Sequence, residues 1–273
     1  MRYFLGVDGG GTGCRAMLVD AGGRLLGQGL AGPANIMSDA QAATEAIMEA
    51  SLQALQGRPP AEVSACLGIA GARISGAVGW LGPRLPFGRC RVLGDGEIAV
   101  AGALGARDGI VVALGTGSLF TRQLAGAFAS IGGWGPVLGD EGGGAWMGRQ
   151  LLARVLRAQD GLEPETPLVR RVLQRMGGAQ MVVGFARSAS GADFAAQVPE
   201  ILHAGDDPLA QAILAEAQAH VEAGIARLQT DPALPVIFAG RLGSLLAPRV
   251  TRWPRAEPLG SALDGALRLA RAP

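Results

Sequence analysis

The sequence predicts an α/β protein of two domains, each a mixed β-sheet with flanking helices, with a cleft between the domains. The main observation is a repeat: an apolar strand that ends in a glycine-threonine-glycine turn occurs at 3–13 and again at 110–118. The chain has 273 residues, enough for two ordinary domains. Hydrophobic residues make up 49% and charged residues 17%, which argues against disorder.

The first repeat opens a predicted meander of three strands. The strand before the first turn is followed by a returning strand at 14–19, a hairpin turn at 20–23 and a third strand at 24–30. A helix over 40–56 is expected next, capped by Ser38 or Asp39 and ended by Pro59 and Pro60. The remaining elements of this half are strands at 63–69 and 90–93 and a helix near Arg73, which complete one α/β domain.

The second repeat opens a half that is richer in helices. Helices are expected at 143–157, 167–176, 192–204 and 208–228, and a short strand at 236–239 leads into the glycine turn 240–244. Helical spacing at 260–270 predicts a last helix that returns to pack on the first domain. The expected domains are therefore 1–108 plus 256–273, and 109–255.

Composition excludes several classes of function. All 24 basic residues are arginine, so the Walker phosphate loop, the protein-kinase lysine and Schiff-base chemistry are excluded. Three isolated cysteines and two histidines offer no zinc or iron–sulfur spacing. A net charge of +1 gives no electrostatic case for nucleic acid or an anionic membrane, so a small molecule is the expected partner.

The chain carries no recognisable signal peptide or membrane span. Asp8 interrupts the first apolar stretch, and no run of 18 apolar residues occurs. We therefore expect a cytoplasmic protein whose cysteines are small buried hydrophobic residues.

The two glycine turns indicate phosphate binding, because bare backbone N–H groups can approach an anion closely. The first turn comprises Gly9, Gly10, Gly11 and Thr12, and the second Gly115, Thr116, Gly117 and Ser118. Asp8 stands at the end of the first strand, where a carboxylate can hold hydrated Mg²⁺. Two such turns suit one polyphosphate held between two domains.

The order of these motifs resembles the fold shared by actin, hexokinase and the heat-shock chaperone ATPases, a ribonuclease H-like fold. Within it the chain is similar to the BadF/BadG/BcrA/BcrD-type ATPases, and there to the glucosamine and N-acetylglucosamine kinases. The segments that carry the resemblance are 6–15, 33–37, 94–96, 132–135 and 139–142, and the helical middle at 158–161 and 166–168 looks closest to bacterial glucosamine kinases.

The resemblance implies an ATP- and Mg²⁺-dependent kinase that phosphorylates O6 of an amino sugar, glucosamine first, with N-acetylglucosamine as the alternative. It makes Asp95 the base that accepts the proton of the sugar hydroxyl. It places sugar contacts at Asn35, Asp95, Gly133, Trp134 and Asp140, and adenosine contacts at Gly240, Gly243 and Ser244. Closure of the two domains would exclude water and suppress hydrolysis.

Ordinary structural explanations of the same residues also remain open. Trp134 is equally well explained as a core residue, and Asp140 and Glu141 as caps of the helix that begins near 143. Gly240 and Ser244 equally suit a helix start, Arg15 suits a solvated charge, and Arg241 suits a contact with phosphate or ribose.

Two other functions are weighed against the kinase. An ATPase that activates a dehydratase or reductase needs cysteines for an iron–sulfur cluster, and none follows the second turn. A non-catalytic sugar sensor of the regulator type usually carries a DNA-binding segment, and this chain starts at its first strand. The sequence leaves open the 2-substituent of the sugar, the nucleotide preference, the role of Glu141 and the oligomeric state, although relatives of this kind are often dimers.

Overall fold

The structure is a computed structural model that describes residues 1–272, and the chain divides into two compact units. Unit 1 comprises 1–111, 121–129 and the C-terminal segment from 256, and unit 2 comprises 112–120 and 130–255. The roles that the sequence assigns to two domains stay predictions, and each unit is described here by itself.

The unit 1 sheet has the strand order β3-β2-β1-β4-β5. Its strands are β1 (Tyr3–Gly9), β2 (Cys14–Asp20), β3 (Leu25–Ala31), β4 (Val63–Ile69) and β5 (Arg89–Gly94). The first three form the expected antiparallel meander, whereas β1, β4 and β5 run parallel. The carboxyl ends of these three parallel strands therefore meet at one edge, because Gly9 pairs with Ile69 and Ile69 with Gly94.

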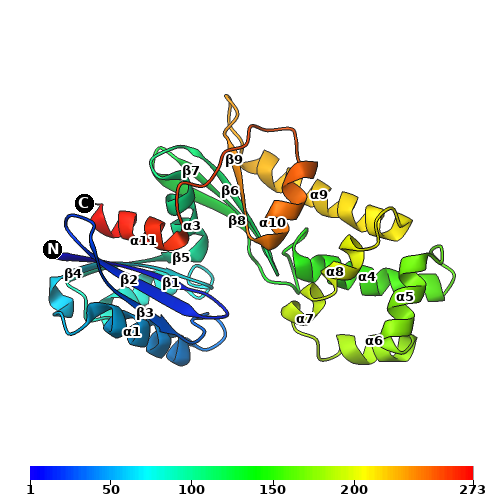
Figure 1. Ribbon diagram of the computed structural model, residues 1–273, viewed down its shortest axis with the longest axis horizontal. Coiled ribbons are helices and arrows are strands. Elements are labelled where there is room, and N and C mark those ends of the chain that lie inside the picture. The colour runs from blue at the N-terminus through cyan, green and yellow to red at the C-terminus, as the bar shows by residue number, and fades with distance from the viewer. Residues whose placement is uncertain (273) are drawn as a thin grey trace. The chain divides into compact units, whose positions relative to one another are not determined.

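Helices cover both faces of this sheet (Figure 1). The helix α1 (Ala40–Leu55), capped by the Asp39 side chain, packs on β3 and β2, while α3 (Asp95–Leu104) and α11 (Ala262–Arg271) pack on the other face. The strand β4, which lies between β1 and β5, is buried along its whole length, as expected for a parallel strand covered on both sides. The last helix thus packs against β1 and α3, as its apolar spacing predicts.

A second sheet has the order β8-β7-β6-β9. Its strands are β6 (Gly109–Leu114), β7 (Ser118–Leu124), β8 (Ala127–Gly132) and β9 (Val236–Ala239). This order repeats the β3-β2-β1-β4 order of the first sheet, so the repeated strand-turn motif opens two sheets that share the order of four strands.

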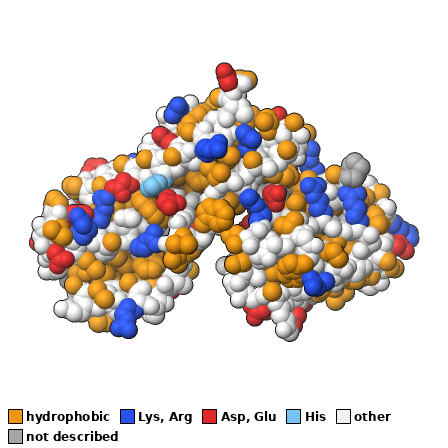
Figure 2. Space-filling view, turned by 180° about the vertical axis from the view of Figure 1, so that it is seen from behind, with side chains coloured by type: hydrophobic (Ala, Val, Ile, Leu, Met, Phe, Trp, Pro, Cys, Tyr) orange, Lys and Arg blue, Asp and Glu red, His pale blue; other side chains and the backbone are white. Residues whose placement is uncertain are grey.

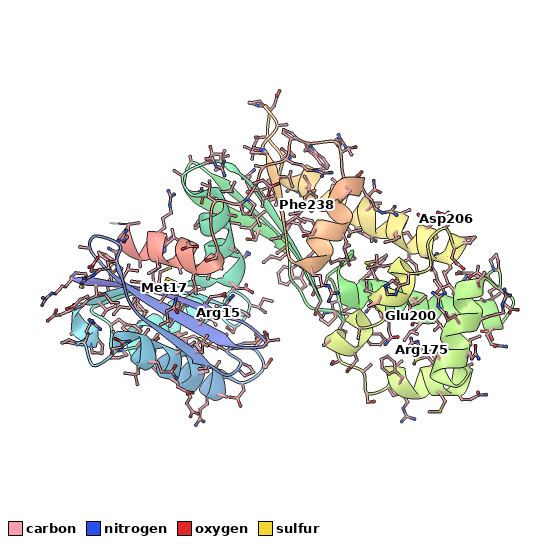
Figure 3. All side chains as sticks on the ribbon, viewed as in Figure 1. Arg15, Met17, Arg175, Glu200, Asp206 and Phe238 are labelled. Atoms are coloured by element: carbon pink, nitrogen blue, oxygen red, sulfur yellow. The ribbon has the colours of Figure 1, made fainter. Side chains whose placement is uncertain are left out.

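Unit 2 contains a cluster of helices that packs around α4 (Gly144–Gln159). The others are α5 (Pro167–Met176), α6 (Ala179–Ala186), α7 (Gly191–Ala195), α8 (Val198–Leu202) and α9 (Pro208–Leu228), whereas α10 (Arg241–Leu246) packs on β9. Ion pairs from Arg171 and Arg175 to Glu200, at 2.9 and 3.2 Å, tie α5 to α8; Figure 3 labels Arg175 and Glu200.

Several elements differ from the sequence-based expectation. The strand β8 and the helix α6 were not expected, and the single helix expected at 192–204 is two helices, α7 and α8. The helix expected near Arg73 is the short α2 (Ala77–Trp80), and short 3-10 turns occupy Pro60–Glu62, Gly82–Arg84 and Ala247–Arg249.

The mixture of charges on the surface and the burial of the cysteines are as the composition predicts. Basic and acidic side chains lie interspersed on the face drawn in Figure 2. Within residues 1–272 no helix is long and apolar enough to cross a bilayer. Cys14 and Cys66 are buried and Cys90 is partly buried, and burial raises the pKa of each thiol to about 12, so all three are protonated at neutral pH.

Candidate active site

Unit 1 brings four of the predicted site elements to the carboxyl edge of its sheet. Asp8 lies at the end of β1, the first turn follows it, and Asp95 follows β5. The loop of Asn35 is hydrogen-bonded to the first turn and to the residue after β4: Ala34 N–H donates to Gly10 O at 2.8 Å and Ile36 N–H to Ala70 O at 3.1 Å. Neighbouring strands lie about 4.8 Å apart, so two strand spacings separate the end of β1 from that of β5.

The first turn is a tight loop with an open outer face. Gly10 N–H donates to Gly13 O at 2.9 Å and closes the turn, while Gly11 and Thr12 are exposed. A Cβ built on Gly11 would meet nothing within 4 Å, whereas one on Gly9 would lie 2.8 Å from the Ile69 side chain. The turn is therefore anchored on its inner side and accessible on its outer side, as an anion-binding loop requires.

Asp8 is held by an arginine that sequence reasoning treated as a solvated charge. Arg15 Nη2 lies 2.6 Å from Asp8 Oδ2, and the Asp8 side chain is 16% exposed. Figure 3 labels Arg15, which stands on β2 directly opposite Asp8. The sequence could have given this pairing, because residues at equal distances from a hairpin turn lie opposite each other on the two strands.

Asp95 is the first residue of α3 and its carboxylate is partly exposed. Gly96 N–H donates to Asp95 Oδ1 at 2.9 Å. Burial raises the pKa of Asp95, that hydrogen bond lowers it, and the charge of Asp8 raises it further; the net direction is upward. A carboxylate with a raised pKa is a better proton acceptor than an ordinary one.

Asn35 lies beside the end of β4. Its Oδ1 accepts from Met37 N–H at 3.0 Å, a turn that fixes the side chain. A Cβ on Gly71, which has a φ of +77°, would lie 2.9 Å from the same oxygen. The contact with Met37 uses the amide oxygen, and the side-chain NH₂ keeps its donors for a ligand.

Unit 2 presents the second turn on the N-terminus of α4. Gly144 N–H and Ala145 N–H donate to Gly115 O and Thr116 O, each at 2.8 Å. Ser118 Oγ donates to Glu141 O at 2.9 Å. The carbonyl groups of the turn thus point towards α4, whose positive helix end lies behind the turn and favours an anion there. Gly115 and Thr116 are exposed.

The third glycine turn lies against the second one. A Cβ on Gly240, which has a φ of +82°, would be 2.3 Å from Leu114 O, the residue just before Gly115. Ser244 N–H donates to Gly240 O at 3.2 Å, so α10 starts here as one reading of the sequence expected. Gly243 is buried and Ser244 and Arg241 are exposed.

The structure settles two open readings of the 133–141 segment. Trp134 is 68% exposed, so it is not a core residue. The N-cap of α4 is Gly143 with no side-chain cap, so neither Asp140 nor Glu141 caps that helix. Asp140 is instead buried against the second turn, and Gly133, with a φ of +72°, leads into an exposed loop.

No cluster of three or more His, Cys, Asp or Glu side chains that could hold a metal occurs in residues 1–272. Asp8 and the open turn beside it fit Mg²⁺ held largely through water, since magnesium keeps several waters and needs few protein carboxylates.

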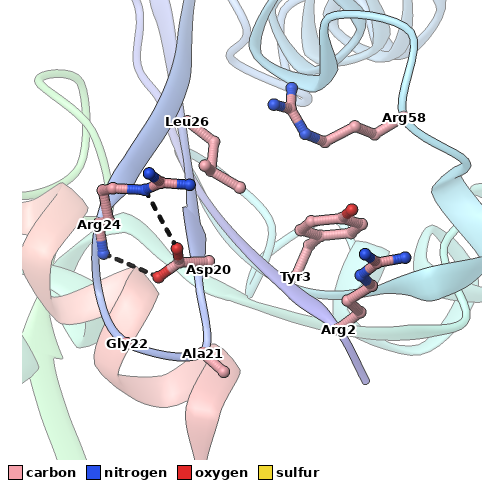
Figure 4. Close-up of a pocket in the computed structure, with 8 residues that line it drawn as sticks. All are labelled: Arg2, Tyr3, Asp20, Ala21, Gly22, Arg24, Leu26 and Arg58. Atoms are coloured by element: carbon pink, nitrogen blue, oxygen red, sulfur yellow. Dashed lines mark hydrogen bonds and ion pairs between the residues drawn. The ribbon is translucent and has the colours of Figure 1, made fainter.

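A separate cavity of about 410 Å³ lies in unit 1 at the amino end of β1 (Figure 4). Its charged groups are already partnered: Arg24 pairs with Asp20 at 3.3 Å, and Arg58 donates to Leu55 O at 3.1 Å and lies over the Tyr3 ring. None of the predicted site residues lines it.

Comparison with known proteins places this chain in a family. Residues 5–240 match the model of the BadF/BadG/BcrA/BcrD ATPase family. The chain is 32% identical to a glucosamine kinase of Vibrio cholerae over 100% of this chain and 97% of that protein. It is 34% identical to an N-acetylmuramic acid/N-acetylglucosamine kinase of Clostridium acetobutylicum over 59% of this chain and 55% of that one.

The chain is also similar to solved structures of sugar kinases. A crystal structure of a putative N-acetylglucosamine kinase from Chromobacterium violaceum is 32% identical, with a TM-score of 0.87 over 99% of both chains. A Streptomyces griseus ROK-family glucokinase, in complex with glucose and AMPPNP, shares the fold with a TM-score of 0.57 over 98% of this chain and 99% of that one, at 21% identity. With its two sheets of repeated topology and its three glycine turns, the chain belongs to the BadF/BadG/BcrA/BcrD ATPase family.

Proposed function

We propose that this protein is an ATP-dependent amino-sugar kinase that transfers the γ-phosphate to O6 of glucosamine. The observation that carries the proposal is the placement of Asp95, with a raised pKa, at the same sheet edge as Asp8, the first glycine turn and Asn35. The relatives named above act on glucosamine or N-acetylglucosamine by their names, and the family is one of ATPases, which supports ATP as the phosphoryl donor.

In this proposal each turn has a defined task. The turns Gly9–Thr12 and Gly115–Ser118 bind phosphate oxygens through the N–H groups that are not already used within the protein, since Gly10 N–H donates to Gly13 O, Gly115 N–H to Gly117 O and Ser118 N–H to Asp140. Gly240, Gly243 and Ser244 contact the adenosine. Asp8 holds Mg²⁺ through water, and the ion neutralises charge on the phosphates when it is bound. Asp8 gives up its pairing with Arg15 for this role, which frees a guanidinium near the phosphates.

Asp95 orients the sugar hydroxyl and takes its proton as that oxygen attacks phosphorus. Phosphoryl transfer depends mainly on positioning and charge stabilisation, so fixing the hydroxyl matters as much as removing its proton. Asn35 donates to a sugar hydroxyl and Asp140 accepts from others, while Gly133 and Trp134 line the sugar. Each such partner left unpaired would cost on the order of 1–3 kcal/mol.

N-acetylglucosamine is the second candidate, and one observation favours it. The loop that contains Trp134, Val137 and Leu138 exposes these side chains by 68, 81 and 87%. An apolar loop beside the sugar contacts suits an acetyl methyl group better than an ammonium. Cytoplasmic location and a homodimer remain predictions from the sequence and its resemblance.

The sharpest test of the catalytic assignment is Asp95→Asn. We expect near-complete loss of sugar-dependent ADP release with the affinity for Mg·ATP kept within a few fold, because the amide keeps the shape of the carboxylate but cannot accept a proton. Glu97→Gln is the matched control: it removes a carboxylate two residues away while its amide oxygen can still accept from Gly94 N–H. Turnover of Asp95→Asn at the wild-type rate would refute the role of Asp95.

A further inference from the structure

Asp140 is a buried carboxylate that touches both the second glycine turn and the exposed loop before it. Its Oδ1 accepts from Gly135 N–H at 3.2 Å. A Cβ built on Gly117 would lie 2.2 Å from Asp140 Oδ2, so the carboxylate occupies the space that any other residue at position 117 would fill. Asp140 is 6% exposed and adopts a φ of +60°, which is unusual for a residue other than glycine.

This position is held by several independent contacts within unit 2. Gly143 N–H donates to Asp140 O at 2.9 Å, and a Cβ on Gly143 would lie 2.7 Å from the Gly117 carbonyl carbon. The bonds from Gly144 and Ala145 to the turn continue this contact into α4. The turn and the backbone of Asp140 therefore move as one piece, and a side chain held in a strained backbone at such a point suggests a functional role.

The Asp140 carboxylate and a nucleotide phosphate would be two negative groups at the same glycine turn. In the proposed function the turn 115–118 binds phosphate, and the Asp140 carboxylate already lies against this turn and accepts the Ser118 N–H as well as the Gly135 N–H. Two negative groups that approach one set of amides repel each other, and the repulsion is large where water is excluded. Because Asp140 is 6% exposed, its negative charge is poorly solvated, and this burial raises its pKa.

We propose that Asp140 couples sugar binding to nucleotide binding through this shared turn. A sugar hydroxyl that donates to Asp140 partly neutralises the carboxylate that lies against Gly117 and accepts the Ser118 N–H, so the nucleotide phosphate binds this turn more tightly. By linkage, the bound nucleotide strengthens sugar binding by the same factor. The inference rests on the proposed sugar kinase function and adds a mutual coupling to it: phosphate binds more tightly when the acceptor sugar is present, which limits hydrolysis of ATP without sugar.

The first experiment measures the coupling directly. Mg·AMP-PNP, a non-hydrolysable ATP analogue, is titrated calorimetrically into the wild-type protein without sugar, with saturating glucosamine and with saturating N-acetylglucosamine. We expect the Kd to fall by at least about 5-fold with the sugar that is the substrate, within the usual range of coupling between two sites. An unchanged Kd with a sugar that the protein phosphorylates would overturn the coupling and leave the kinase function standing.

The second experiment needs no sugar. Asp140→Asn keeps the size and one acceptor oxygen but removes the charge, so we expect Mg·AMP-PNP to bind several-fold more tightly than to wild type when no sugar is present. Asp160→Asn is the matched control, because it removes the charge of an exposed aspartate at the other end of α4, and its Kd should equal that of wild type. Equal or weaker binding by Asp140→Asn would overturn the inference.

Failure of the proposed kinase function and failure of the coupling through Asp140 give different results. If neither sugar is phosphorylated and neither binds, the proposed function fails, while the sugar-free titration of Asp140→Asn still tests the repulsion between Asp140 and phosphate. If a sugar is phosphorylated but does not change the Kd for Mg·AMP-PNP, only the coupling role of Asp140 is refuted. Thermal melting of each variant shows whether it folds, and the wild-type titration stands whatever the variants do.

Discussion

At the scale of single residues, the candidate site holds two carboxylates, Asp95 and Asp140, in surroundings that disfavour their negative charge. Burial raises the pKa of Asp95 and of Asp140, so in each case the ionised form is less stable in the folded protein than in the unfolded chain. Carboxylates held at a cost in stability are typical of functional sites.

Replacing Asp95 should therefore stabilise the protein while it removes activity. A raised folded pKa means that folding binds a proton, so this residue destabilises the native state above its folded pKa, and the penalty disappears as the pH falls below its unfolded value of about 3.9. We expect Asp95→Asn to melt at a higher temperature than wild type at pH 7, and the difference to shrink towards pH 4. Thermal unfolding as a function of pH measures this; a variant that melts lower at pH 7 would contradict it.

The assignment of Asp8 to Mg²⁺ predicts a change in metal dependence. Asp8→Asn should raise the Mg²⁺ concentration that gives half-maximal turnover, because a neutral amide holds a hydrated dication less well. Asp20→Asn is a matched control, since Asp20 also ends a strand and also pairs with an arginine, Arg24, but at the opposite edge of the sheet. A titration with Mg²⁺ at fixed ATP should separate the two variants, and equal Mg²⁺ dependence would count against the role of Asp8.

At the scale of elements, helix α3 owes its position to α11. A Cβ on Gly265 of α11 would lie 1.9 Å from Ile98 O and 2.4 Å from Gly102 N, so the two helices cross at backbone contact. Asp95 begins α3, and this crossing therefore fixes the helix that carries the proposed base.

A pair of glycine substitutions tests that packing. Gly265→Ala should destabilise the protein by about 1–3 kcal/mol, because backbone atoms on the facing helix cannot move aside for the methyl group. Gly184→Ala in α6 meets nothing within 4 Å and should instead stabilise by about 0.5–1 kcal/mol through helix propensity. Urea unfolding measures both; equal effects of the two substitutions would refute the tight crossing.

The elements that sequence patterns missed share a physical cause. The strand β8 is short and mostly half-buried, so its side chains show no alternation of apolar and polar residues. The helix α6 is apolar on nearly all sides although only Val182 is buried, and so it lacks a helical period. The break between α7 and α8 had a signal, because Pro199 stands in the first turn of α8, where proline is tolerated but cannot continue a helix.

At the scale of the whole molecule, the repeated strand and glycine turn carried most of the predictive information. The motif predicted two sheets, and the four-strand order of the second repeats the order of four strands in the first. The ion pair of Arg15 with Asp8 was not foreseen because hairpin register sets it, although the Arg15 side chain is 62% exposed, as a solvated charge would be. Trp134 was left open between a core residue and a sugar contact because the apolar character of a side chain does not reveal its exposure. The burial of Asp140 against Gly117 involves two segments more than 20 residues apart, which local patterns cannot bring together.

The central claim is that ATP turnover depends on an amino sugar. The direct measurement is ADP release with ATP and Mg²⁺ in the presence of glucosamine, N-acetylglucosamine, glucose or no sugar. We predict fast release with glucosamine and slow release without sugar; a preference for N-acetylglucosamine would keep the kinase and change the substrate. Steady ADP release that no sugar accelerates would contradict the kinase assignment and favour the ATPase-activator alternative.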